Sequence, residues 1–240
     1  MIKYIFFDLG NTLVDMSISR KALYFGLKSV LSNKLVTEEL VLKWEKESCK
    51  TFEHYCKKGE FYTVKKLQAM SLKNVLSEYD IDLAEPKLID IVNEFWRYFI
   101  KNCKLYEAAV PTLSQLALDG YELGLITDGD EENVTMILKQ HNLNNMFKIK
   151  VISGVLKSYK PGLLLFERAL ELAKCLPREA IYVGDSVTDI YGAKKLGLIT
   201  ILIHRNQPIE SRVEIEPDFK INSLSKIPAI VNNILSTNNK

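Results

Sequence analysis

The chain has 240 residues, of which 47% are hydrophobic. This length and apolar content suffice for one large domain, or for a core with one inserted lobe, and they exclude a wholly disordered chain. The formal net charge is only +2, from 32 basic and 30 acidic residues, and no basic run stands out, so we expect no nucleic-acid partner. The four cysteines have neither C-x-x-C nor zinc-ligand spacing and are expected to be reduced thiols.

The first predicted element is a short apolar strand over residues 4–7, which ends at Asp8 and is followed by the turn residues Gly10-Asn11. A continuous apolar run of this length is typical of a strand buried on both faces of a parallel sheet. The N-terminus lacks the features of a signal peptide, and no apolar run approaches the roughly 20 residues of a membrane span. We therefore expect a cytoplasmic protein without a membrane partner.

From residue 17 to residue 104 the pattern changes to long, helically periodic segments with little Gly or Pro. Four helices are predicted, near 19–33, 37–57, 62–79 and 85–103. Thr37 is a helix-start signal, Gly59 is a stop signal and Pro86 suits a first helical turn. The aromatic and aliphatic residues of this segment are expected to form the core of a bundle, with an aromatic substrate box as the alternative: Leu42, Phe52, Tyr55, Phe95, Trp96 and Phe99.

After Tyr106 the pattern alternates between helix and strand. Helices are predicted at 110–118, 131–141, 163–173, 190–196 and 225–235, and strands at 121–126, 149–152, 180–183, 200–203 and 218–221. This alternation predicts an α/β fold with a parallel sheet and right-handed crossovers. We expect an α/β domain of residues 1–16 and 105–240, interrupted by a helical domain of residues 17–104. An insert directly after the first strand is placed to cover the carboxyl ends of the strands, where open α/β sheets bind ligands.

Polar residues interrupt the apolar pattern at several predicted strand ends or the loops after them. Asp8 and Thr127 each follow a strand, Lys160 lies in Ser-Tyr-Lys-Pro, and Asp185 follows Val-Gly with Asp189 four residues later. Each alone is more often a turn former, a helix cap or a surface residue. Together they gather a carboxylate, a hydroxyl, an ammonium and an acidic pair at one edge of one sheet.

This combination suits phosphoryl transfer. Magnesium prefers oxygen ligands, often one or two carboxylates with substrate phosphate and water, and Asp8 and Asp185 are candidates for that role. A carboxylate also serves as a nucleophile that forms an aspartyl-phosphate and divides one difficult step into two. Thr127, backbone N–H groups and Lys160 would neutralise charge on the transferred group.

Four segments in order resemble the motifs of the haloacid dehalogenase-like (HAD) hydrolases, of the subfamily I type with a helical C1-type cap. They are Phe7-Asp8-Leu9-Gly10-Asn11-Thr12-Leu13, Leu125-Ile126-Thr127-Asp128-Gly129, Tyr159-Lys160-Pro161 and Val183-Gly184-Asp185-Ser186-Val187-Thr188-Asp189. The resemblance covers essentially the whole chain. It implies a three-layer Rossmann-like core with a four-helix cap inserted after the first strand.

The resemblance also implies a role for each matching residue. Asp8 would be the nucleophile and a ligand of Mg2+. The Gly10 carbonyl, Asp185 and Asp189 would complete the metal site, Asp189 directly or through water. Thr127, Asp128, Gly129 and Lys160 would bind the transferred phosphoryl group. The expected partner is a small phosphorylated metabolite, and the expected assembly is a monomer or a homodimer.

Gly10 departs from the pattern of most phosphatases of this family. They carry a second Asp at this position, which protonates the leaving group and later activates water. General acid–base help of this kind is worth about 10²–10⁴ in rate. Asp15, Asp128 and Asp130 are candidate substitutes, each more often structural. A 2-haloacid dehalogenase-like hydrolase that attacks carbon, or a weakly active ligand-binding protein, are therefore the alternatives to a phosphatase.

Overall fold

The computed structural model describes residues 1–33, 35–205 and 215–237. The chain divides into two compact units. The α/β unit contains the described residues of Met1–Asp15, Lys104–Asp128 and His141–Lys240. The helical unit contains those of Met16–Cys103 and Gly129–Gln140.

The α/β unit is built on a six-stranded sheet in the order β5-β4-β1-β6-β7-β8, with every neighbouring pair parallel. Its strands are β1 (Tyr4–Phe7), β4 (Glu122–Thr127), β5 (Ile149–Ile152), β6 (Ala180–Gly184), β7 (Ile199–Ile203) and β8 (Phe219–Ile221). This arrangement confirms the predicted α/β fold with a parallel sheet. The central strand β1 is buried along its whole length, as its continuous apolar run predicted.

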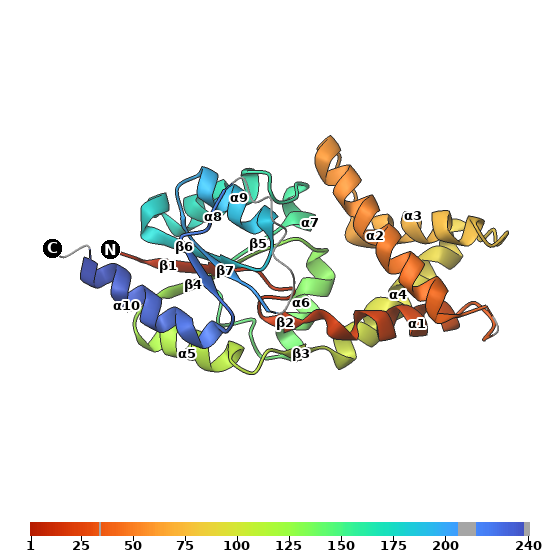
Figure 1. Ribbon diagram of the computed structural model, residues 1–240, viewed down its shortest axis with the longest axis horizontal. Coiled ribbons are helices and arrows are strands. Elements are labelled where there is room, and N and C mark those ends of the chain that lie inside the picture. Colours follow the sequence, from red (N-terminus) through yellow and green to blue (C-terminus); the bar gives the residue numbers. More distant parts are fainter. Residues whose placement is uncertain (34, 206–214, 238–240) are drawn as a thin grey trace. The chain divides into compact units, whose positions relative to one another are not determined.

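Helices cover both faces of this sheet and make three layers (Figure 1). One face carries α8 (Leu164–Ala173) and α9 (Val187–Lys195), and the other carries α5 (Ala109–Leu118) and α10 (Ile227–Thr237). Phe6, Phe166 and Tyr182 are among the buried residues of the core between the sheet and α8. Several short elements were not predicted, among them the helix α7 (Ser153–Leu156) and the strands β2 (Val14–Asp15) and β3 (Lys104–Leu105), which pair antiparallel.

The helical unit contains the four predicted helices. They are α1 (Ser19–Lys28), α2 (Glu38–Lys58), α3 (Val64–Ser77) and α4 (Glu85–Asn102). The side chain of Thr37 accepts a hydrogen bond at the start of α2, and Gly59 ends it with a left-handed backbone. Helix α1 ends before the predicted residue 33. The Ser29 hydroxyl and N–H both donate to the Gly26 carbonyl, and such local bonding competes with helix continuation.

The core of the helical unit is centred on Trp44, Leu72, Phe95 and Phe99, all of which are buried. The indole N–H of Trp44 donates to the Gln68 carbonyl and the Ser71 hydroxyl, which satisfies its polar atom. The prediction that Leu42 belongs to this core is wrong, because its side chain is 38% exposed. Trp44, two residues later in α2, is buried in this core instead.

Helix α6 (Glu131–Gln140) groups with the helical unit, whereas the sequence pattern placed all of residues 105–240 in the α/β domain. Asp130, which precedes α6, accepts the backbone N–H groups of Val64 at 2.8 Å and Lys65 at 2.9 Å. Carboxylates at a helix N-terminus satisfy its free N–H groups, so Asp130 ties α6 to the first turn of α3. A membrane-spanning helix is absent from the described residues, since none of their helices is both long and apolar enough.

Candidate active site

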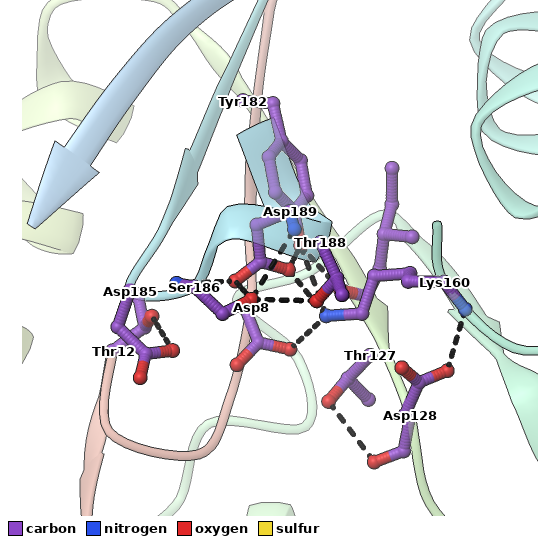
Figure 2. A network of polar contacts seen from close by, with 11 residues as sticks. Asp8, Thr12, Thr127, Asp128, Lys160, Tyr182, Asp185, Ser186, Thr188 and Asp189 are labelled. Atoms are coloured by element: carbon purple, nitrogen blue, oxygen red, sulfur yellow. Dashed lines mark hydrogen bonds and ion pairs between the residues drawn. The ribbon is translucent and has the colours of Figure 1, made fainter. Parts of the chain in front are cut away.

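Three neighbouring strands of the α/β unit bring the predicted site residues to one edge of the sheet. Asp8 directly follows β1, Thr127 is the last residue of β4, and Asp185 directly follows β6. Strands β4 and β6 flank β1, with Phe7 level with both Leu125 and Val183. The parallel register therefore places these three side chains together, and Lys160 and Asp189 join them (Figure 2).

The Lys160 ammonium is the centre of the site. Its Nζ lies 2.7 Å from Asp8 Oδ1 and 2.6 Å from Asp189 Oδ1. All three side chains are buried. Burial disfavours the charge on Lys160, but Asp189 and Asp8 raise its pKa well above the ordinary value. Lys160 is therefore a fixed positive charge beside the carboxylate of Asp8.

The Asp189 carboxylate is fully occupied by protein donors. Besides Lys160, its Oδ1 accepts the Tyr182 hydroxyl at 2.9 Å, while its Oδ2 accepts the backbone N–H of Ser186 at 3.1 Å and the Ser186 hydroxyl at 2.8 Å. Burial opposes ionisation, but Lys160 and Ser186 hold the pKa of Asp189 below its ordinary value. At Gly184 an added Cβ would lie 2.5 Å from Asp189, so the close approach of this carboxylate to the strand requires glycine.

The carboxyl groups of Asp8, Asp185 and Asp189 offer oxygens that lie within 4.8 Å of one another. Burial, followed by repulsion from Asp189 and Asp8, raises the pKa of Asp185 to about 7. The Thr12 hydroxyl donates a hydrogen bond to Asp185 Oδ1, but this bond is long, at 3.4 Å. Lys160 lowers the pKa of Asp185 without offsetting these effects, and a hard cation with oxygen ligands fits this donor set.

The Gly10 carbonyl, the remaining implied metal ligand, accepts the N–H of Thr12 at 2.6 Å. A carbonyl oxygen has two lone pairs, so one stays available for a cation. The oxygens of Asp189 differ in this respect, because protein donors already surround them. The geometry thus favours Asp8, Gly10 and Asp185 as direct ligands, with Asp189 acting through Lys160.

The segment after β4 supplies the other implied phosphate-binding residues. The Thr127 hydroxyl lowers the pKa of Asp8 through a hydrogen bond, although burial and Asp189 leave that pKa above its ordinary value. Asp128 accepts the backbone N–H of Lys160 at 3.2 Å, which connects two loops of the site (Figure 2). Burial raises the pKa of Asp128 to about 7. At Gly129 an added Cβ would meet Val134 at 2.8 Å, so the turn into α6 favours glycine.

Tyr182 is a site residue that was not predicted from the sequence. It lies in β6, and its buried hydroxyl accepts from Lys160 Nζ at 3.3 Å while donating to Asp189. The sequence feature that could have identified Tyr182 is that it is the single hydroxyl-bearing residue inside the apolar strand 180–183. A buried Tyr hydroxyl needs hydrogen-bond partners, and here they are the Asp189 carboxylate, to which it donates, and the Lys160 ammonium, from which it accepts.

Arg205 is a second residue that was not predicted, located just after β7. Its guanidinium donates to the backbone carbonyls of Asn11 and, at 2.9 Å, Thr12, both in the loop after Asp8. The guanidinium carbon lies 3.5 Å from the centre of the Tyr106 ring. Arg205, Tyr106 and Asn11 line a small cavity of about 40 Å³ together with Asp185. Arg205 therefore fixes the loop that presents the Gly10 carbonyl.

We expect Arg205→Lys to weaken the response to magnesium. A lysine keeps the charge but cannot donate to two carbonyls while stacking on Tyr106. The loss should lower stability by about 1–3 kcal/mol, measured by urea unfolding, and should raise the magnesium concentration for half-maximal activity several-fold. The matched control is Arg168→Lys in α8, which makes the same change in an exposed pair with Glu171 and should change neither quantity measurably. An unaltered magnesium response in Arg205→Lys would contradict this role.

Comparison with known proteins identifies relatives across most of the chain. The family model described as haloacid dehalogenase-like hydrolase matches residues 5–203. A glyceraldehyde 3-phosphate phosphatase of Pyrococcus furiosus is 29% identical over 204 residues, covering 83% of this chain and 80% of that protein. The pyrophosphatase PpaX of Bacillus cereus is 30% identical over 132 residues, covering 54% of this chain and 60% of PpaX. This chain thus matches less than two thirds of the length of PpaX.

Solved structures with the same fold include proteins with different chemistry. The protein YfnB of Bacillus subtilis, solved bound to magnesium, has a TM-score of 0.79 at 20% identity, with 96% of this chain and 99% of that chain covered. An L-2-haloacid dehalogenase of Xanthobacter autotrophicus, with chloropropionic acid covalently bound, has a TM-score of 0.77 at 17% identity, with 97% and 99% covered. At these identities the likeness establishes the fold alone.

Proposed function

This chain belongs to the haloacid dehalogenase-like hydrolases, and we propose that it is a magnesium-dependent phosphatase that forms an aspartyl-phosphate on Asp8. The observation that carries this proposal is the placement of Asp8. Its carboxylate lies 2.7 Å from the Lys160 ammonium and within 4.8 Å of oxygens of Asp185 and Asp189. A nucleophile, a fixed cation and a candidate magnesium site therefore meet at one carboxylate.

The proposed roles follow from this geometry. Asp8 attacks phosphorus, and Lys160 holds both the nucleophile and the phosphoryl oxygens by its positive charge. Thr127 and the backbone at Asp128 and Gly129 donate to the remaining phosphoryl oxygens. Magnesium, when held by Asp8, the Gly10 carbonyl and Asp185, would reduce the negative charge that repels the nucleophile from the phosphate.

The named relatives support a small phosphorylated metabolite as substrate. Two of them are a glyceraldehyde 3-phosphate phosphatase and a pyrophosphatase, both of which hydrolyse bonds to phosphorus. We extend the proposal to a helical domain of residues 17–104 inserted into an α/β domain of residues 1–16 and 105–240, and to a monomer or homodimer that binds neither nucleic acid nor membranes. The near-neutral balance of 32 basic and 30 acidic residues supports the exclusion of nucleic acid.

The test is phosphate release from a panel of small phosphorylated compounds, with magnesium and with excess chelator. We expect release only with magnesium. Asp185→Asn should raise the magnesium requirement at least tenfold or abolish activity, because the amide keeps the size but loses the charge. Asp119→Asn is the control, since Asp119 is an exposed acidic residue at the end of α5. Full activity in chelator, or an unchanged magnesium requirement in Asp185→Asn, would contradict the metal assignment.

A dehalogenase is the second candidate, and Gly10 is the observation that favours it. Halide leaves carbon without a proton, so an enzyme that attacks carbon needs no acid at position 10. In that case chloride should appear from 2-haloacids without added metal. A ligand-binding protein, the third candidate, would turn over neither class of compound but would gain thermal stability with its ligand by mass action.

A further inference from the structure

We propose, on the basis of the phosphatase function above, that the substrates are acyl phosphates or phosphoanhydrides, whose leaving groups depart as stable anions. Alkyl phosphates would be poor substrates. We further infer that hydrolysis of the aspartyl-phosphate limits turnover. Both statements follow from what surrounds Asp8 in the described part of the chain.

The first observation concerns Gly10, two residues after the nucleophile. Among the described glycines, Gly59, Gly120 and Gly197 have the positive φ that favours glycine, and Gly10 does not. A positive φ therefore does not explain the glycine at position 10. What the glycine changes is the chemistry, since no side chain there can donate a proton to a leaving group.

The second observation concerns the acidic residues nearest to these motifs in the sequence. Both oxygens of Asp130 accept N–H groups from the first turn of α3. Asp128 points toward the backbone N–H of Lys160, while the carboxylate of Asp8 points toward the Lys160 ammonium (Figure 2). Asp185 belongs to the candidate cation cluster. Asp15, the remaining candidate, interacts electrostatically with the Arg205 guanidinium. Each of these carboxylates thus already has a structural, electrostatic or metal-binding role.

The third observation concerns the loop after Asp8. Asn11 carries an amide, which is neither an acid nor a base at neutral pH. The Thr12 hydroxyl donates to Asp185, and the Arg205 guanidinium, which keeps its protons, spans two backbone carbonyls of the loop. Tyr106 stacks against Arg205. The described loop therefore fixes its own conformation without offering a dissociable proton.

The acidity of the leaving group determines which substrates can react without a general acid. A carboxylic acid has a pKa of about 4 and a phosphate has a second pKa of about 6, so both leave as anions at neutral pH. An alcohol is about as weak an acid as water, whose pKa is about 16, and it needs a proton to leave. General acid help is worth about 10²–10⁴, so its absence penalises alkyl esters most.

The first step then balances without a protein acid. An oxygen of Asp8 forms a bond to phosphorus, and the bond from phosphorus to the leaving oxygen breaks. The electron pair stays on that oxygen, which departs as a carboxylate or phosphate anion. No proton moves.

The described carboxylates above, already engaged in other roles, would not serve as a base for the second step either. Water forms a bond to phosphorus, the bond to Asp8 breaks, and one proton of the water passes to a phosphoryl oxygen. The products are the Asp8 carboxylate and dihydrogen phosphate. Because none of the described groups discussed above would accelerate this transfer, the aspartyl-phosphate should accumulate when a good leaving group makes the first step fast.

The test is a leaving-group series on the wild-type protein with magnesium. The probes are acetyl phosphate, inorganic pyrophosphate, p-nitrophenyl phosphate and glycerol 2-phosphate, and acetyl phosphate and pyrophosphate distinguish the two proposed classes. We expect kcat/KM to fall at least 100-fold from the better of these two to glycerol 2-phosphate. We also expect p-nitrophenyl phosphate to give a burst of p-nitrophenol close to one equivalent of enzyme.

Gly10→Asp and Gly10→Asn form a matched pair, because their side chains differ little in size and only the first carries a transferable proton. The ratio of kcat/KM for glycerol 2-phosphate to that for acetyl phosphate should be at least tenfold higher in Gly10→Asp than in Gly10→Asn. The burst should be smaller in Gly10→Asp, since its carboxylate serves as the base of the second step. An equal ratio in the two variants would overturn the inference.

The leaving-group series on the wild-type protein tests the proposed substrate class even if both Gly10 variants misfold. Equal rates across the series would overturn the substrate class while leaving the phosphatase function intact. In that case a selective loss of glycerol 2-phosphate hydrolysis in Asp128→Asn, or in His204→Gln, whose parent residue lines the small cavity beside Asp185, would identify the substitute acid. Release of phosphate from none of the four probes would overturn the phosphatase function and this inference together.

Discussion

Lys160→Met is expected to reduce phosphate release by about 10²–10³ and to destabilise the protein at neutral pH. The catalytic loss follows from removing a fixed charge beside the transferred group, which is typically worth this much. The loss of stability follows from burial, because Asp8 and Asp189 each lose an ammonium within 2.7 Å. Removing one member of a buried ion pair costs about 3–5 kcal/mol, which still leaves most domains folded.

The loss of stability in Lys160→Met should depend on pH. Lys160 holds the pKa of Asp189 below its ordinary value despite burial. A carboxyl with a lowered folded pKa stabilises the protein above the unfolded pKa of about 4, and this contribution is lost as pH falls through the folded pKa. The difference from wild type in urea unfolding should therefore be largest near pH 7 and should shrink below about pH 4. Wild-type turnover in Lys160→Met would remove Lys160 from the site.

Lys139→Met provides the matched control for this substitution. It makes the same chemical change at an exposed position of α6. Exposed charges contribute little to stability, so we expect wild-type unfolding and turnover. Similar losses in both variants would mean that the effect of Lys160→Met is not specific to the site.

Asp8→Asn is expected to abolish phosphate release, by a factor on the order of 10⁴ or more, while leaving the protein at least as stable as wild type without metal. The amide is a poor nucleophile, so the covalent step fails. The pKa of Asp8 is raised by burial and by Asp189, despite Lys160, so its ionised form is disfavoured in the folded state. A neutral amide of the same size removes this penalty and still accepts a hydrogen bond from Lys160.

The gain in stability from Asp8→Asn should depend on pH. A carboxyl with a raised folded pKa lowers stability as pH rises above the unfolded pKa of about 4, and has no effect below it. The advantage of Asp8→Asn in thermal melts should thus appear near pH 7 and vanish in acid. Magnesium should raise the melting temperature of the wild type more than that of Asp8→Asn, because the variant lacks one anionic ligand. Residual turnover near the wild-type rate would rule out Asp8 as nucleophile.

The contrast between the two variants separates catalysis from folding. Both should lose activity, but only Lys160→Met should lose stability at neutral pH. The two variants differ in stability because they change opposite charges. Lys160 is a single cation among several buried carboxylates, so its removal leaves them without compensation. Asp8 is one of three carboxylates that repel each other, so its neutralisation reduces that repulsion. Equal destabilisation of both variants would mean that the site is held together by contacts other than these charges.

The sequence determined the features that depend on local pattern. Alternating helical and apolar segments predicted the parallel sheet, and Asp8, Thr127 and Asp185 were predicted to share an edge because each follows an apolar strand. Helix ends at Thr37 and Gly59 were also predictable, because capping involves only neighbouring residues. Periodicity and turn chemistry are encoded within a few residues, and they require no knowledge of distant contacts.

Tertiary packing decided the features that depend on distant residues. Lys160 and Asp8 are 152 positions apart, and the cross-link of Arg205 to the loop after Asp8 spans 193 positions or more. The attachment of α6 to the helical unit depends on Asp130 and the first turn of α3, and the burial of Trp44 in place of Leu42 depends on which face of α2 meets its neighbours. The physical reason is that a buried hydrogen bond or ion pair needs two partners brought together by packing, and the pattern around either partner contains no record of the other.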